Sequence, residues 1–262
     1  VGKDILRFHA IYWPAFLMAA GLAPQRRVFA HGWWTAEGQK MSKSLGNVIE
    51  PNQAIAKYGL DPLRYFLLRE LPFGQDGDFS HRAMVSRINS ELANDLGNLA
   101  QRVLSFVAKN AGAKVPTPGA FTDADKKLLG AAAKVVDAVR KMLTKEQAFY
   151  EALGAIWQVV RQGNGYIDEQ APWTLRKTDP ARMETVLYVL CETLRHLGIM
   201  VQPFMPGAMG KLLDQLAVPA DARAFKALSE PLVAGTPLPE PHGIFPRFLE
   251  EGAAAPPGRK KG

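Results

Sequence analysis

Two lysines and two serines stand close together near the start of the chain, in a pattern that could hold a nucleoside triphosphate. Lys40, Ser42, Lys43 and Ser44 lie in a glycine-flanked segment, 36–47. Ammonium groups in such a loop can offset the charge that develops on departing pyrophosphate, while hydroxyl groups and backbone N–H donors hold the phosphate oxygens. The alternative is a solvated basic loop, because short lysine-rich patterns recur by chance.

A second group of chemically useful side chains occupies the N-terminal segment. Ile5, Phe8, His9 and Trp13 follow helical spacing, so we expect them along one face of a helix. An imidazole and an indole on this face could line an apolar pocket beside a thioether, and sulfur–aromatic contacts contribute roughly 0.3 to 1.5 kcal/mol. The alternative is that these are core residues of an amphipathic helix.

A third group could contact nucleic acid. Asn94, Asn98 and Arg102 recur at four-residue intervals, so they form a polar file along a helix. Amide and guanidinium groups pair with base edges, and arginine also stacks on exposed bases. Trp173 follows a proline where a helical pattern ends, and we expect it to be presented from a loop, where it could stack a splayed-out base. The alternatives are a solvated surface for the polar file and a core plug for the tryptophan.

These motifs together resemble the methionyl-tRNA synthetases, a family of class I aminoacyl-tRNA synthetases. The run 40–44, with Met41 inside it and Gly46 after it, is similar to the second signature of the class. The series GKDI, FH and WPA at 2–5, 8–9 and 13–15 narrows the resemblance to this family. The Asn-Asn-Arg file and the proline-tryptophan pair also match its pattern. The resemblance covers nearly all of residues 2–247.

The resemblance implies three sets of site residues. The catalytic set, which would stabilise the adenylation transition state, comprises Lys40, Lys43, Ser42 and Ser44. The pocket for ATP and methionine would include Gly2, Asp4, Ile5, Phe8, His9, Trp13 and His31. The tRNA anticodon would be read by Asn94, Asn98, Arg102 and Trp173.

The resemblance also implies the ligands: methionine, methionine tRNA and ATP with Mg²⁺, the metal being held largely by the nucleotide and water. Cys191 is the single cysteine, so neither a disulfide nor a zinc knuckle can be built from these residues, and we predict no metal site in them. The formal net charge of +7 suits contact with a polyanion. Without a bilayer-spanning stretch or a signal-peptide pattern, we expect a cytoplasmic protein with no membrane partner. No appended dimerisation domain is recognisable, so we expect a monomer.

Hydropathy patterning predicts a mainly α-helical protein in three parts with a tail. Residues 1–50 read as helix, strand, turn and loop, the closing part of a Rossmann-like α/β catalytic domain. Residues 51–80 form a connector with two short helices, ended by a glycine turn at 74–80. Residues 81–232 form a helical-bundle anticodon-binding domain. Residues 233–262 form a tail, in which the apolar segment 244–247 folds back towards the connector, as in the family.

Within the bundle, apolar residues step by three and four through one long helix that ends near 110–112. A second helix opens with a capping box at Thr122 and Asp125. A third covers about 146–166 and contains Trp157 as a core residue. A fourth begins at Asp179 and Pro180, and a short fifth ends near Leu216.

We therefore expect a methionine-tRNA ligase, present here as a C-terminal portion. The sequence contains no first signature of the HIGH type, so we expect the chain to be inactive alone. The alternative is a stand-alone tRNA-binding module without catalysis. A purely structural helical bundle is a third interpretation, which the lysine-serine loop disfavours. ATP–pyrophosphate exchange distinguishes the first two.

Overall fold

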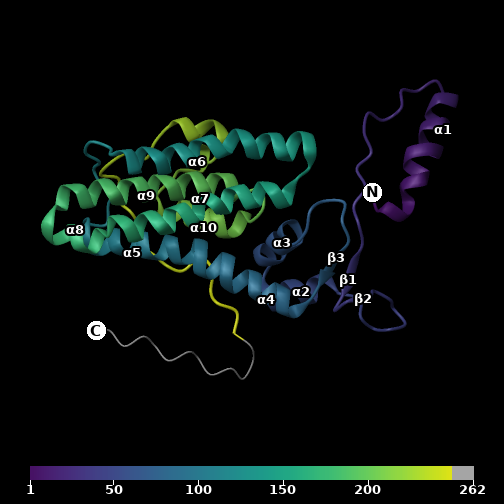
Figure 1. Ribbon diagram of the computed structural model, residues 1–262, viewed down its shortest axis with the longest axis horizontal. Coiled ribbons are helices and arrows are strands. Elements are labelled where there is room, and N and C mark those ends of the chain that lie inside the picture. Colours follow the sequence, from purple (N-terminus) through teal and green to yellow (C-terminus); the bar gives the residue numbers. More distant parts are fainter. Residues whose placement is uncertain (250–262) are drawn as a thin grey trace.

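The computed structural model describes residues 1–249, and the rest of the predicted tail, 250–262, lies outside the described residues. The chain is mainly α-helical with one small sheet, as predicted (Figure 1). Most helices lie side by side in a bundle. The N-terminal segment leaves this body as an arm that ends in α1 (Trp13–Ala19), preceded by short helical turns at Lys3–Ile5 and Phe8–Tyr12.

The sheet joins two segments that are far apart in the sequence. Strand β1 (Trp34–Ala36) pairs antiparallel with β2 (Gln39–Lys40) and parallel with β3 (Gly77–Phe79). The strand expected within residues 1–50 is present but short, because regular pairing begins only at Trp34. The turn predicted at 74–80 is present at its start, where Gly74 has a φ of 99°, but residues 77–79 form β3. Pairing with a distant strand is a long-range contact, and the local sequence does not reveal it.

The two predicted connector helices are present and lie between the sheet and the bundle (Figure 1). Helix α2 (Pro51–Tyr58) begins with proline in its first turn and is capped by the Glu50 carboxylate, which accepts from the Gln53 N–H at 2.7 Å. Gly59 then adopts a φ of 89°, which favours glycine and separates α2 from α3 (Leu60–Arg69).

Two side chains of α3 attach the connector to the bundle. Asp61 accepts a 2.5 Å hydrogen bond from the N–H of Ala208, in the first turn of α10. Arg64 donates to the carbonyl oxygens of Pro203 and Phe204, both at 2.8 Å. These two side chains therefore tie α3 to the start of α10 and to the turn before it.

The predicted long helix is confirmed. It runs through α4 (His81–Arg87), a π-helical stretch (Ile88–Gly97) and α5 (Asn98–Asn110) without a break. Ser80 caps its start by accepting from the N–H of Ala83 at 3.2 Å. Its apolar stripe is buried, because Leu92, Leu96, Leu99 and Val103 are all 0% exposed.

The remaining helices also follow the predicted order. Helix α6 has the expected capping box at Thr122 and Asp125. The third helix begins and ends a few residues later than predicted, because a π-helical turn (Met142–Glu146) extends α6 first. One helix was missed altogether, α8. The bounds are α6 (Asp123–Lys141), α7 (Phe149–Gln170), α8 (Pro172–Thr178), α9 (Pro180–Val201) and α10 (Pro206–Gln215).

Helix α9 lies in the centre of the bundle, and nearly every residue from Met183 onwards is buried. Trp157 on α7 is 0% exposed, as predicted, and its indole N–H donates to the carbonyl oxygen of Glu91 at 3.2 Å. This hydrogen bond links α7 to the long helix. The buried apolar residues of the bundle form one continuous core.

The apolar segment near the C-terminus folds back towards the connector, as expected. Ile244 and Phe245 are buried against the bundle. The amide of Asn89 holds the backbone of Phe248 from both sides, accepting from its N–H at 2.8 Å and donating to its carbonyl at 3.1 Å. The Phe248 ring lies 5.4 Å from that of Tyr58, at the end of α2. Two short 3₁₀ turns, Ala220–Ala222 and Phe225–Ser229, precede this segment.

Candidate nucleotide and nucleic-acid sites

The lysine-serine run lies at the end of a short hairpin. A two-residue turn joins β1 to β2, with φ of 50° at Glu37 and 77° at Gly38, as in tight hairpins. Asp78 on β3 fixes this turn by accepting from Thr35 Oγ1 at 2.6 Å and from the Gly38 N–H at 2.7 Å. The hairpin thus presents Lys40 at the start of the loop.

Asn47 closes this loop, and the sequence reasoning did not single it out. Its Oδ1 accepts from the Ser42 N–H at 2.8 Å, and its Nδ2 donates to the Lys40 carbonyl at 3.1 Å. The hydroxyls of Ser42 and Ser44 lie 2.7 Å apart. An Asn next to Gly46, which has a φ of 65°, is a turn signal that could have identified it. The loop is therefore a turn that the Asn47 side chain closes through two hydrogen bonds.

The two lysines of the loop are exposed. The ammonium of Lys40 lies 5.8 Å from the ring centre of Trp33, and the ammonium of Lys3 lies 4.3 Å from the same ring. Indole faces attract cations electrostatically. With Lys43 nearby in sequence, the loop gathers positive charge and hydroxyl donors, a combination suited to phosphate oxygens.

Asp76 holds the N-terminal segment against the sheet and was also missed. It accepts from Lys3 Nζ at 2.6 Å and from the Trp33 N–H at 2.8 Å. The hydrogen bond from Lys3, followed by that from Trp33, lowers the pKa of Asp76 below its usual range. The predicted turn at 74–80 therefore supplies two carboxylates, Asp76 and Asp78, that position the loop and the N-terminal segment.

Three of the predicted pocket residues lie together. Gly2 forms a parallel bridge with His31, in which the Lys3 N–H donates to the His31 carbonyl at 3.0 Å. A Cβ on Gly2 would lie 2.5 Å from Oδ1 of Asp4 and 3.8 Å from Cε1 of His31. The absence of a side chain at Gly2 thus keeps space beside Asp4 and His31.

The other pocket residues form an uncovered apolar face. Ile5, Phe8 and Trp13 are 39%, 57% and 52% exposed. Nδ1 of His9 lies 3.0 Å from the Ile5 carbonyl, so the imidazole is held against its own helical turn. Within residues 1–249 this face is not covered by other parts of the chain.

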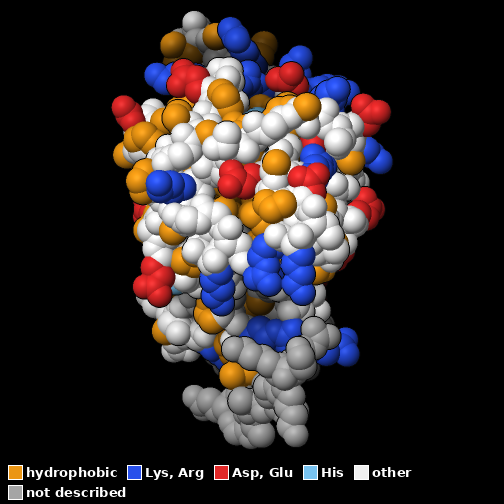
Figure 2. Space-filling model, turned by 90° about the vertical axis from the view of Figure 1, so that its left-hand side faces the viewer, with side chains coloured by type: hydrophobic (Ala, Val, Ile, Leu, Met, Phe, Trp, Pro, Cys, Tyr) orange, Lys and Arg blue, Asp and Glu red, His pale blue; other side chains and the backbone are white. Residues whose placement is uncertain are grey.

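The anticodon candidates lie on the bundle. Arg102 on α5 and Trp173 on α8 meet, with the Arg102 guanidinium carbon 5.6 Å from the indole ring. Arg102 also donates to Asp168 at 2.5 Å. Trp173 is 43% exposed, and Asn98 is exposed one turn before Arg102. Figure 2 shows Lys and Arg side chains gathered on this end of the bundle.

Asn94 is occupied by a partner from the C-terminal segment. Its Oδ1 accepts from Arg247 at 2.5 Å. Because a guanidinium can only donate, the Asn94 oxygen faces Arg247 and the Asn94 NH₂ group faces away from it. The structure thus brings Arg102 and Trp173 into contact. Asn94 and Asn98 lie on the same long helix as Arg102, nearer to the connector.

The backbone around Trp173 differs from the prediction. Trp173 lies in the first turn of α8, with Pro172 in the first position, rather than in a loop. Ala171 has a φ of 43° and is left-handed, whereas a residue before proline was expected to be extended. The tight reversal from α7 into α8 requires this conformation. The indole is nevertheless exposed, as the prediction required.

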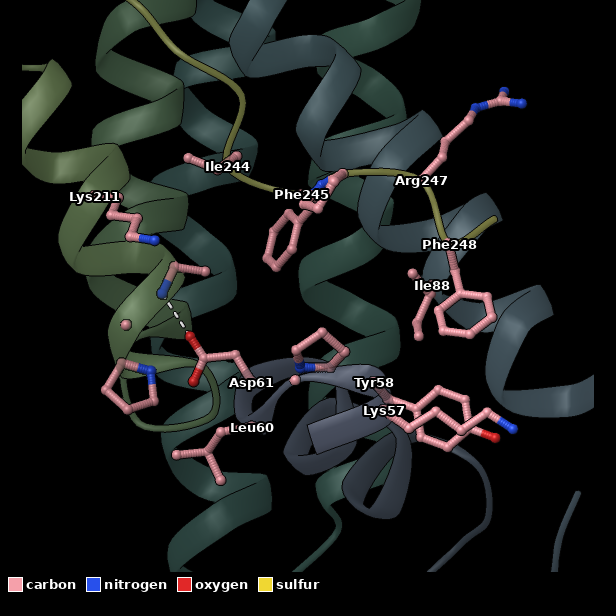
Figure 3. Close-up of a pocket in the computed structure, with 16 residues that line it drawn as sticks. Lys57, Tyr58, Leu60, Asp61, Ile88, Lys211, Ile244, Phe245, Arg247 and Phe248 are labelled. Carbon is pink, nitrogen blue, oxygen red and sulfur yellow. Dashed lines mark hydrogen bonds between the residues drawn. The ribbon is translucent and has the colours of Figure 1, made fainter. Parts of the chain in front are cut away.

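A cavity of about 580 Å³ lies at the seam between the connector, α10 and the C-terminal segment (Figure 3). Phe245 points into it, and Asp61 and Lys211 line one side. None of the predicted site residues lines it. A second cavity, of about 470 Å³, lies between the lysine-serine loop and α2, where Asn47 and Tyr58 line it.

Within the described residues, we find no group of three or more His, Cys, Asp or Glu side chains placed to hold a metal ion. No helix in residues 1–249 is long and apolar enough to cross a membrane.

The sheet, the lysine-serine loop and the helical bundle are the parts of a class I aminoacyl-tRNA synthetase. The family model for class I tRNA synthetases (M) matches residues 1–104, and the model for the anticodon binding domain of methionyl tRNA ligase matches residues 115–257. The chain belongs to the methionyl-tRNA synthetase family.

Curated relatives agree. The methionine–tRNA ligase of Brucella suis biovar 1 (strain 1330) is 60% identical over 251 residues, which are 95% of this chain and 48% of the relative. That of Mycobacterium leprae (strain TN) is 52% identical, over 95% of this chain and 47% of the relative. The chain thus spans about half the length of the curated relatives it matches.

A solved structure shows the same arrangement. The Mycobacterium tuberculosis methionyl-tRNA synthetase in complex with methionyl-adenylate is 52% identical and superposes with a TM-score of 0.91, covering 94% of this chain and 49% of that chain. The apo form of the enzyme from the same organism superposes with a TM-score of 0.89.

Proposed function

We propose that the chain serves methionine-tRNA ligase activity, the ATP-dependent attachment of methionine to its tRNA through methionyl-adenylate. The observation that carries this proposal is the contact between Arg102 and Trp173 on the exposed end of a bundle whose family model is an anticodon binding domain. The lysine-serine loop supplies the second, nucleotide-facing element. An RNA-reading surface and a phosphate-facing loop on one chain fit a tRNA ligase.

At the loop, Lys40 and Lys43 stabilise the charge that develops on pyrophosphate during adenylation, and Ser42 and Ser44 donate hydroxyl hydrogen bonds. Both ammonium groups are exposed, so they are accessible to a triphosphate. Mg²⁺ accompanies ATP and is held mainly by phosphate oxygens and water. With Cys191 buried and single, the proposal gives this chain no zinc site.

In the N-terminal segment, the apolar face of Ile5, Phe8 and Trp13, with His9 beside it, contacts methionine and the nucleotide. Gly2, Asp4 and His31 form the neighbouring wall, where a side chain at position 2 would intrude. The exposure of the apolar face supports this role, because large exposed apolar patches on proteins mark binding surfaces.

On the bundle, Trp173 stacks an anticodon base, and Arg102 and Asn98 pair with base edges. Asn94 offers its NH₂ group, since Arg247 occupies its oxygen. The guanidinium of Arg102 is already fixed by Asp168 and by the indole, so little side-chain entropy is lost when RNA binds.

The proposal divides the chain into a catalytic part (1–50), a connector (51–80), an anticodon-binding bundle (81–232) and a tail (233–262). We also propose that the protein is a monomer and is located in the cytoplasm. Size-exclusion chromatography with light scattering tests the monomer, and a mass of two chains would contradict it.

ATP–pyrophosphate exchange and RNA binding, measured on the chain, test the function. We expect no exchange from the chain alone, together with binding of an RNA stem–loop that carries the CAU anticodon. Exchange in a full-length enzyme that contains this chain would establish the ligase. RNA binding with no exchange in that enzyme would favour the alternative of a tRNA-binding module without catalysis.

A further inference from the structure

Helix α8, which carries Trp173, has its two ends joined by one hydrogen bond. Oε1 of Gln170 accepts from Nη2 of Arg182 at 2.7 Å. Gln170 is the last residue of α7, and Arg182 lies in the first turn of α9. The hydrogen bond therefore joins the end of α7 to the start of α9, and α8 lies in the segment between these two residues.

The same guanidinium is anchored in the bundle. Arg182 donates to the two oxygens of Asp125 at 2.5 and 2.7 Å, and the Tyr166 hydroxyl donates to the same carboxylate at 2.5 Å. Asp125 is 0% exposed. Burial alone would raise its pKa, but the hydrogen bonds from Arg182, Tyr166 and the Thr122 N–H outweigh burial and lower the pKa to about 2. The anchor is therefore ionised at neutral pH.

The backbone beside this hydrogen bond is strained. Ala171, between Gln170 and α8, has a φ of 43°, a left-handed conformation that is unfavourable for a residue other than glycine. Such a conformation persists only where its surroundings hold it. Pro172 is buried while Trp173, next to it, is exposed, so a small rotation of α8 would move the indole away from Arg102.

We propose that Gln170 and Arg182 are positioning residues that hold the Trp173 indole in its exposed orientation beside Arg102. The inference rests on the proposed stacking of Trp173 on the anticodon. Neither residue needs to touch RNA, because both act through α8. By joining the two ends of the segment that contains α8, they order the indole before RNA binds and reduce the entropy lost on binding.

The sharpest test uses Gln170→Met, which removes the acceptor, keeps the side-chain length and leaves the buried pair of Asp125 and Arg182 intact. The matched control is Gln158→Met, the same change at an exposed position of the same helix. Acrylamide quenching of Trp173 is obtained for each protein as the difference from its Trp173→Phe counterpart. We expect altered quenching for Gln170→Met and none for Gln158→Met.

Binding of a CAU stem–loop and of one with an altered anticodon provides the second measurement. Gln170→Met should weaken CAU binding by about three- to tenfold, because the indole must then be ordered when RNA binds, and should have less effect on the altered RNA. Gln170→Glu, which keeps an acceptor for Arg182, should bind CAU more tightly than Gln170→Met. A merely structural role would lower the melting temperature without this dependence on the anticodon.

The outcomes separate this inference from the proposed function. If Gln170→Met changes neither Trp173 quenching nor CAU binding while Trp173→Ala weakens CAU binding, the inference is overturned and the proposed function stands. If Trp173→Ala binds both RNAs like the unchanged protein, the proposed stacking fails. Trp173 quenching in Gln170→Met then decides by itself whether the two residues position the indole.

Discussion

The N-terminal arm and the helical bundle use similar side chains in opposite ways. Trp13 in the arm is 52% exposed, whereas Trp157 in the bundle is 0% exposed and hydrogen-bonded. The arm is held by polar contacts, chiefly to Asp76 just before β3, and the bundle by a continuous apolar core. Apolar side chains thus stabilise the bundle, while those of the arm are left available for contacts outside the described residues.

The largest expected effect tests this contrast directly. Trp157→Ala should lower the free energy of unfolding by about 3 to 5 kcal/mol, because it leaves a cavity and removes the hydrogen bond from the indole to the Glu91 carbonyl. Trp13→Ala should change it by less than about 0.5 kcal/mol. Urea unfolding followed by circular dichroism measures both. Equal losses for the two variants would show that the arm has a core of its own.

The second effect concerns catalysis by the lysine-serine loop. In a full-length enzyme that contains this chain, Lys43→Ala should slow adenylate formation by about 2.7 to 4 kcal/mol of transition-state stabilisation, by analogy with the loss of one oxyanion donor. Methionine affinity should hardly change, because the charge on pyrophosphate develops only in the transition state. Pre-steady-state adenylation measures the rate. Lys134→Ala, at an exposed lysine of α6, is the control, and an unchanged rate in Lys43→Ala would exclude the assignment.

The third effect concerns recognition by the bundle. Trp173→Ala should weaken binding of methionine tRNA by roughly 1 to 3 kcal/mol, and the penalty should shrink for a tRNA with a changed anticodon. A double-mutant cycle between protein and tRNA measures this coupling. Trp33→Ala, at an exposed tryptophan of the arm, should show no coupling to the anticodon. Strictly additive losses would mean that Trp173 does not contact the anticodon.

The last effect is a dependence of stability on pH that we expect from the bundle and not from the arm. Burial raises the pKa of Glu192, but hydrogen bonds from His196 and Arg195 outweigh it and lower the pKa from 4.5 to about 2, and Asp125 falls from 3.8 to about 2. A lowered pKa stabilises the folded state above the unfolded value, and this contribution is lost as pH falls from about 4.5 towards 2. Urea unfolding across this range should show the bundle losing stability.

A variant from each region checks that assignment. Asp125→Asn should flatten the dependence on pH. Asp76→Asn should leave it unchanged, because its pair with Lys3 is exposed and weak. A profile that followed Asp76 instead would place the acid-sensitive contacts in the arm.

Much of the bundle could be predicted from the sequence. The capping box at Thr122 and the cap at Asp179 mark helix starts through hydrogen bonds that span only three residues. The long helix was visible from its apolar period, which depends only on its own turns. Helix α8 was missed, because it is short and begins after Ala171, whose left-handed backbone is not encoded by its residue type.

The arm was predicted less well, because its order comes from distant partners. Nothing local distinguishes β3 from a turn; its pairing with β1 decides. Asp76 and Asp78 gained their roles from that pairing, since it brings them to Lys3 and Gly38.

For the candidate sites, the sequence by itself determined the residue types and their spacing along helix and loop, since these need only the local chain. It thereby supplied the lysine-serine run and the polar file of α5. Only the tertiary structure brought Arg102 to Trp173 and Arg182 to Gln170 and Asp125. These contacts form when separate helices pack together, and packing depends on the shape and burial of the whole core, which no local pattern contains.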